Sequence, residues 1–126
     1  MSAVTLARFL HGEVRPGEFP HREHLRMAFE VLKSHDFATA ALHYANALRS
    51  LTARAGRPEA FNMTVTVAFL AVIAERLAAD RACDFGQFTQ AHPELFDRRL
   101  LERWYRPERL ASPLARAAFV LPEPRG

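Results

Sequence analysis

The stretch FNMTVTVAFLAVIAERLA, residues 61–78, decides the fold class of this chain. The β-branched run MTVTV would suit a strand, but apolar residues continue at helical spacing into AFLAVIAERLAA and favour a helix. A helix that is apolar on most sides lies at the centre of its domain. We therefore predict a central helix over about residues 58–79, with Pro58 in its first turn. Its main face would consist of Phe61, Val65, Ala68, Phe69, Val72 and Ile73, widened by Met63, Val67, Leu70 and Leu77.

Three amphipathic segments precede the central helix. Apolar residues at helical spacing, together with glycine and proline boundaries, predict helices over about residues 5–11, 21–34 and 36–55. Pro20 restricts Phe19 to an extended conformation, so the second of these helices can begin only after it. Asp36 is a suitable N-cap for the third.

The chain after residue 80 breaks into shorter pieces. Asp97 could cap a helix over residues 98–105, and Ser112 followed by Pro113 predicts another helix start. No segment alternates in the manner of a strand. We predict an all-α single domain over residues 1–126, a helical bundle of four to five main helices with an irregular, partly helical C-terminal third.

The composition of the chain argues against a disulfide-linked, membrane-spanning or secreted protein. The chain has 126 residues, of which 49% are hydrophobic, and a single cysteine, so an intrachain disulfide is excluded. No apolar run approaches the roughly 18 residues that span a bilayer. The first residues lack the pattern of a signal peptide. We expect a cytoplasmic protein that does not associate with membranes.

The basic residues are almost all arginine. Lys33 is the only lysine among 17 basic residues, and five arginines fall in RRLLERWYRPER, residues 98–109. Arginine binds carboxylate and phosphate groups through its planar guanidinium, although genomic composition alone could also produce this preference for arginine over lysine. Because Glu102 and Glu108 interrupt the cluster and the net charge is only +3, the sequence argues against a nucleic-acid partner.

The first candidate site is a histidine pair, His21 and His24, in FPHREHLRMAF. Side chains three residues apart share one face of a helix. His21 lies four residues before Leu25, and His24 four before Ala28, so the pair should face the domain interior. Two imidazoles could bind one divalent transition-metal ion or exchange protons, but a catalytic zinc site usually has three protein ligands. The alternative is that the histidines only cap the helix or bond to each other.

Two further pairs of polar residues could complete this site. Asn62 and Thr66 lie four residues apart on the most apolar predicted helix. Buried polar groups need hydrogen-bond partners. The partner could be a ligand or simply the backbone of the preceding turn. Tyr105 can donate a hydrogen bond, and Arg106 can bind a carboxylate or phosphate. The alternative for WYRPER is that Trp104 and Tyr105 only cover the core beside a surface arginine.

A scattered pattern resembles a family of small, mostly uncharacterised bacterial helical proteins. The resemblance extends from about Phe19 onward, and the matching residues are Phe19, His21, His24, Leu25, Phe61, Asn62, Thr64, Thr66, Trp104, Tyr105, Leu110, Ser112, Ala115, Arg116, Phe119, Val120 and Pro122. In similar sequences the position of Asn62 is often histidine. The resemblance thus implies a centre of three histidines from two helices, of which this chain has two, and it implies no particular activity.

These observations predict a small enzyme or small-molecule-binding protein with a His-lined polar pocket. His21, His24 and Tyr105 would be catalytic, and Asn62, Thr66 and Arg106 would bind substrate. The chemistry would be acid–base or metal-assisted, of the lyase, isomerase or hydrolase type, on a small polar or carboxylate-bearing metabolite. The alternative is a non-catalytic helical module for protein interaction or regulation, with a filled interior. The sequence leaves a homodimer open.

Overall fold

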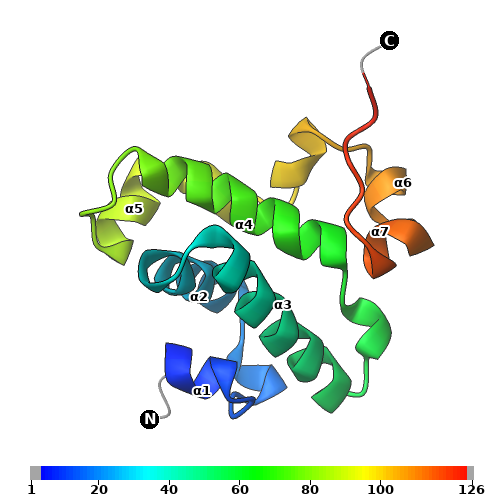
Figure 1. Ribbon diagram of the computed structural model, residues 1–126, viewed down its shortest axis with the longest axis horizontal. Helices are drawn as coiled ribbons and strands as arrows, with labels where there is room; N and C mark the ends of the chain where they lie inside the picture. The colour runs from blue at the N-terminus through cyan, green and yellow to red at the C-terminus, as the bar shows by residue number, and fades with distance from the viewer. Residues whose placement is uncertain (1–3, 125–126) are drawn as a thin grey trace.

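The computed structural model describes residues 4–124, which fold as a set of α-helices and short 3-10 helices with no strand among them. The central element is α4, Met63–Ala78, which crosses the molecule in Figure 1. Helices α2, His21–Ser34, and α3, Phe37–Arg54, pack against each other and against α4. The all-α prediction is therefore confirmed, with α4 in the central place that its apolar sequence requires.

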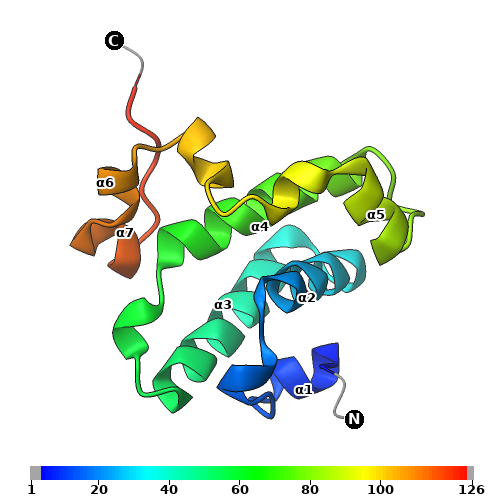
Figure 2. The same ribbon diagram turned by 180° about the vertical axis from the view of Figure 1, so that it is seen from behind.

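Shorter elements surround these three helices. The helix α1, Leu6–Leu10, packs on α2 and α3. The segment after α5 runs back along α4, as Figure 2 shows from behind, and α6 and α7 lie near the first turn of α4. The remaining elements are η1 Pro16–Glu18, η2 Pro58–Ala60, α5 Phe85–Ala91, η3 Pro93–Phe96, η4 Leu100–Arg103, α6 Pro107–Leu110 and α7 Pro113–Ala117.

The first predicted helix boundaries agree with the structure because they depend on local backbone chemistry. Pro20 is extended, and α2 begins at the next residue. The Asp36 carboxylate caps α3 by accepting a hydrogen bond from the Thr39 amide at 2.8 Å. Gly12 follows α1 with a φ of 72°, a left-handed conformation that glycine adopts without strain.

The predicted start of the central helix at residue 58 is wrong. Pro58 instead opens the 3-10 helix η2, and Phe61 is extended. Asn62 is the N-cap of α4, where its side-chain oxygen accepts a hydrogen bond from the Val65 amide at 3.0 Å. A capping side chain removes an unsatisfied amide from the first turn, which favours a helix start at this residue.

The buried face of α4 also differs from the predicted one at its first turns. Thr64 and Thr66 are buried, whereas Val65 is 36% exposed. Later positions agree with the prediction, and Leu70, Ile73 and Leu77 are completely buried. The first turn of α4 therefore directs hydroxyl groups inward, and only its later turns supply an aliphatic core.

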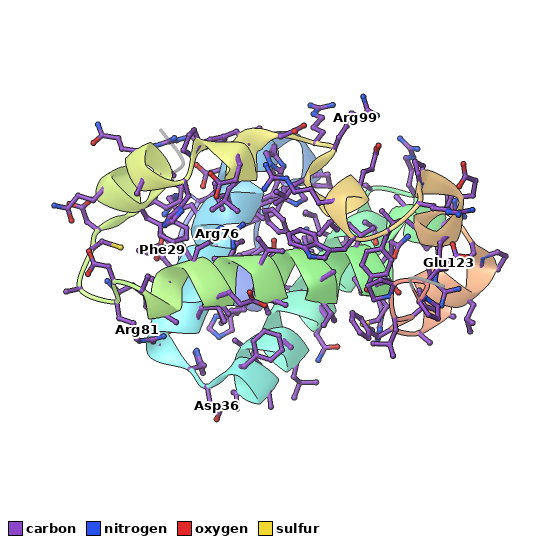
Figure 3. All side chains as sticks on the ribbon, turned by 90° about the horizontal axis from the view of Figure 1, so that it is seen from above. Phe29, Asp36, Arg76, Arg81, Arg99 and Glu123 are labelled. Atoms are coloured by element: carbon purple, nitrogen blue, oxygen red, sulfur yellow. The ribbon has the colours of Figure 1, made fainter. Side chains whose placement is uncertain are left out.

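An aromatic cluster joins the C-terminal third to α2. The Phe29 ring of α2 stacks on Phe88 of α5 at a centroid distance of 5.0 Å and lies 5.6 Å from Phe85. Beyond α5, the Arg76 guanidinium of α4 donates to the Glu94 carboxylate of η3 at 3.0 Å (Figure 3). These contacts hold the segment after α5 alongside both α2 and α4.

The helix predicted over residues 98–105 is only the 3-10 helix Leu100–Arg103. Asp97 does accept a hydrogen bond at the turn, from the Arg99 amide at 2.9 Å, but no α-helix follows it. The predicted start at Ser112 and Pro113 is confirmed, since the Ser112 hydroxyl accepts from the Ala115 amide at 3.1 Å at the start of α7.

An extended segment over residues 118–121 lies against the start of α4. The Thr64 hydroxyl donates to the Ala118 carbonyl at 2.7 Å and accepts from the Val120 amide at 3.0 Å. The Tyr105 hydroxyl donates to the Val120 carbonyl at 2.8 Å, and the Arg109 guanidinium to the Leu121 carbonyl at 2.7 Å. Side chains therefore supply the hydrogen bonds that a neighbouring strand would supply in a sheet.

None of the helices in the described part of the chain has the length and apolar character that crossing a membrane would require.

Replacing Thr64 by valine should lower the free energy of unfolding by about 2 kcal/mol or more, because two buried backbone groups lose their partner. Thr39→Val, on the surface of α3, is the matched control and should change stability far less, since its hydroxyl only donates to Asp36. Urea denaturation measures both effects. Equal stability losses in the two variants would contradict the role assigned to Thr64.

Candidate functional site

A pocket of about 540 Å³ lies between the start of α2, the second half of α3, the start of α4 and the turn between η3 and η4. Volumes of this order are typical of sites for small organic ligands. Four of the six predicted site residues line it, namely His21, His24, Asn62 and Thr66. The other lining residues are Phe19, Pro20, Tyr44, Leu48, Thr52, Ala60, Phe61, Val65, Phe69, Asp97, Arg98, Leu100 and Leu101.

His21 is the first residue of α2, and its ring links this helix to η3. Its Nε2 lies 3.1 Å from the Leu95 carbonyl oxygen, which can only accept, so Nε2 carries the hydrogen. In the neutral ring the lone pair is then on Nδ1. The ring packs 5.7 Å from Phe69 and 6.5 Å from Phe96, measured between centroids. The sequence prediction that this histidine faces the interior is consistent with these contacts.

His24 lies one turn further along α2, with its ring 4.3 Å from that of Phe19. Burial, and to a smaller extent the neighbouring His21, lower the pKa of His24 from 6.5 to about 4, while a hydrogen bond with the Phe19 backbone opposes the shift. His24 is therefore a neutral imidazole at pH 7.

Asn62 and Thr66 line the pocket, but their polar groups already have partners in the protein. The Asn62 amide nitrogen donates to the Leu110 carbonyl at 2.7 Å, while its oxygen caps α4. The Thr66 hydroxyl donates to the Asn62 carbonyl at 2.7 Å, one turn earlier. Thr66 thus adopts the structural alternative, in which the hydroxyl bonds to the preceding turn, while Asn62 caps α4 and holds the Leu110 carbonyl.

Tyr105 and Arg106 do not line the pocket. Tyr105 is 5% exposed, and its hydroxyl holds the segment over residues 118–121 through Val120. Arg106 is the exposed residue before α6, with its Nε 3.9 Å from the Glu123 carboxylate. The 3-10 helix and turn that replace the predicted helix carry both residues away from the histidines. Trp104, predicted to cover the core, is 44% exposed.

The structure adds two charged residues that sequence reasoning missed, Asp97 and Arg98. The Asp97 carboxylate accepts from the Arg99 amide, and Arg99 itself pairs with Glu102 at 3.0 Å (Figure 3). Arg98 makes no hydrogen bond, ion pair or ring contact with any other residue between 4 and 124. The signal in the sequence was the arginine cluster, but its spacing does not reveal which arginine faces a pocket.

The side chains at this site do not fit a metal centre well. Across residues 4–124 there is no group of three His, Cys, Asp or Glu side chains placed to share an ion. The two rings lie 6.4 Å apart between centroids, and His21 Nε2 already faces a carbonyl. Asn62, at the position of the implied third histidine, uses its amide to cap α4 and hold Leu110. No third such donor therefore joins the two imidazoles among the described residues.

Comparison with known proteins found no matching family model, no matching curated protein and no matching solved structure. Functional inference therefore rests on the chemistry of the pocket.

The pKa of His24 predicts a specific dependence of stability on pH. Below pH 6.5 the unfolded chain binds a proton that the folded chain, with a pKa of about 4, does not. The free energy of unfolding should therefore fall between pH 6.5 and pH 4, by at most about 3 kcal/mol, and show no contribution from His24 above pH 6.5. Urea denaturation of the unchanged protein and of His24→Gln at pH 7 and pH 4.5 measures this fall. An identical loss of unfolding free energy in both proteins would show that burial does not lower the pKa of His24.

Replacing Asn62 by histidine tests the implied three-histidine centre. We expect no stoichiometric transition metal in elemental analysis of either the unchanged protein or Asn62→His, because the cap and the Leu110 contact fix this position. The variant should lose about 1 kcal/mol of stability with the cap. Asp36→His, which removes the cap of α3 far from the pocket, is the control for the cap itself. One metal ion per chain in Asn62→His alone would reinstate a metal centre.

Proposed function

We propose that this protein binds a small organic molecule in the pocket between α2, α3 and α4, and that the His21 and His24 imidazoles exchange protons with it. The observation that carries the proposal is the convergence of two histidines and an arginine on one pocket of about 540 Å³ from separate parts of the chain. A core histidine pair without function would more simply be packed against filled volume. The proposal includes an enzyme of the lyase, isomerase or hydrolase type.

The proton chemistry divides between the two rings. His21 is oriented by the Leu95 carbonyl, which leaves Nδ1 as the basic atom of its neutral form. His24 is neutral at pH 7, and an anionic ligand beside it would raise its pKa from about 4 toward the range where an imidazole both takes and returns a proton. Binding would thus bring His24 closer to the pKa that general acid–base catalysis needs.

The alternative, a non-catalytic interaction module, has one specific observation in its favour. Large apolar side chains near the C-terminal end are exposed, with Leu114 at 61%, Phe119 at 46% and Leu121 at 69%. That alternative also requires a filled interior, and the pocket favours the small-molecule proposal instead.

A panel of small carboxylic acids, amides, alcohols and sugars, each at millimolar concentration, tests the proposal by thermal unfolding and by NMR. We expect at least one class to raise the unfolding temperature, since a ligand at about 100 times its Kd stabilises by about 2.7 kcal/mol. His24→Ala and His21→Ala should remain folded and bind that class at least about tenfold more weakly.

The matched control is His43→Ala. His43 lies on α3 with its ring centroid 5.3 Å from that of His35, and it does not line the pocket. It should bind as the unchanged protein does. The proposal fails if no class binds, or if both pocket variants fold and bind with unchanged affinity.

A further inference from the structure

Most polar side chains of the pocket are already committed to the protein backbone. The Tyr44 hydroxyl donates to the His24 carbonyl at 3.0 Å, and the Thr52 hydroxyl to the Arg49 carbonyl at 3.0 Å. Asn62 and Thr66 bond to backbone groups as described above. The three hydroxyls have used their only donor hydrogen, so they can accept a hydrogen bond from a ligand but cannot donate one.

The groups that remain available lie together at one end. His21 reaches η3 through the Leu95 carbonyl, and the chain continues from η3 directly into Asp97 and Arg98. Asp97 turns its carboxylate to the Arg99 amide, whereas the Arg98 guanidinium has no partner in the described chain. The segment after η3 therefore contributes to the pocket lining one arginine without a side-chain partner among the described residues and one carboxylate.

The other lining residues include three phenylalanines, Phe19, Phe61 and Phe69. Phe61, at the end of η2, packs under the Arg49 guanidinium at 5.0 Å, which holds its ring in place. Phe69 is fixed against His21, and Phe19 stacks on Phe9 at 4.9 Å as well as against His24. Flat, fixed rings favour a ligand with a planar or chain-like apolar body.

We infer that the ligand is a monocarboxylic acid with an apolar, preferably aromatic, body, whose carboxylate pairs with Arg98 while its body lies between Phe19, Phe61 and Phe69. This inference names a ligand class for the proposed function and rests on it. A guanidinium presents a planar fork of donors that matches a carboxylate. A dicarboxylate would bury its second carboxylate against hydroxyls that have no donor hydrogen left, which costs affinity.

Three probes separate the parts of this inference: 3-phenylpropionate, 3-phenylpropanamide and succinate, titrated into the full chain and followed by NMR. The amide keeps the apolar body and loses the charge, and succinate keeps charge and loses the body. We expect 3-phenylpropionate to bind at least about tenfold more tightly than either, as loss of one charge-assisted contact predicts.

Arg98→Gln should bind 3-phenylpropionate and its amide with similar affinity, whereas Arg103→Gln should keep the preference for the acid. Arg103 is an equally suitable exposed arginine that does not line the pocket. Retention of the preference in Arg98→Gln would overturn the pairing with this residue.

The remaining outcomes distinguish the inference from the proposed function. Equal binding of acid and amide by the unchanged protein, or tighter binding of succinate, overturns the inference while the pocket still binds ligands. Binding of none of the three also overturns it, and the broader panel of the previous section then decides the proposed function separately.

Discussion

The start of α4 is the constraint on which the rest of the structure depends. Within five residues, Asn62 caps the helix and holds the Leu110 carbonyl, and Thr64 holds the backbone at Ala118 and Val120. The C-terminal third has only short helices, and short helices are marginal without tertiary contacts. These polar side chains give its backbone fixed partners on the central helix. Asn62 also lines the pocket, so the stability of this junction and the shape of the pocket are coupled.

The parts of the fold that could be predicted from sequence are those governed by local chemistry. Pro20, Asp36 and Ser112 mark helix starts correctly because each acts on its own backbone neighbours. The start of α4 was placed too early because Pro58 is equally suited to a 3-10 turn, whereas Asn62 caps α4 and also holds the Leu110 carbonyl. Contacts between residues far apart in the sequence help to decide where such a helix starts, and the periodicity of apolar residues does not reveal those contacts.

The candidate site shows the same division. His21, His24, Asn62 and Thr66 meet at one pocket because they lie at or beside the first turns of α2 and α4, two long helices that the sequence predicts. Tyr105 and Arg106 lie elsewhere because the chain around them bends through 3-10 turns rather than one helix. Arg98 was not singled out because nothing in its own neighbourhood distinguishes it from the other arginines of the cluster. The resemblance implied a centre of three histidines, and at the third position Asn62 instead caps α4 and holds the Leu110 carbonyl.

The way in which residues 118–121 are held has a consequence for how this protein can be altered. Thr64, Tyr105 and Arg109 form their hydrogen bonds to that segment with its backbone, and the side chains of Phe119 and Leu121 are exposed. Recognition of a main chain does not depend on which side chains it carries. These two positions should therefore accept a wide range of residues, including a fluorescent or spin label. They offer attachment points from which events in the pocket could be observed without altering it.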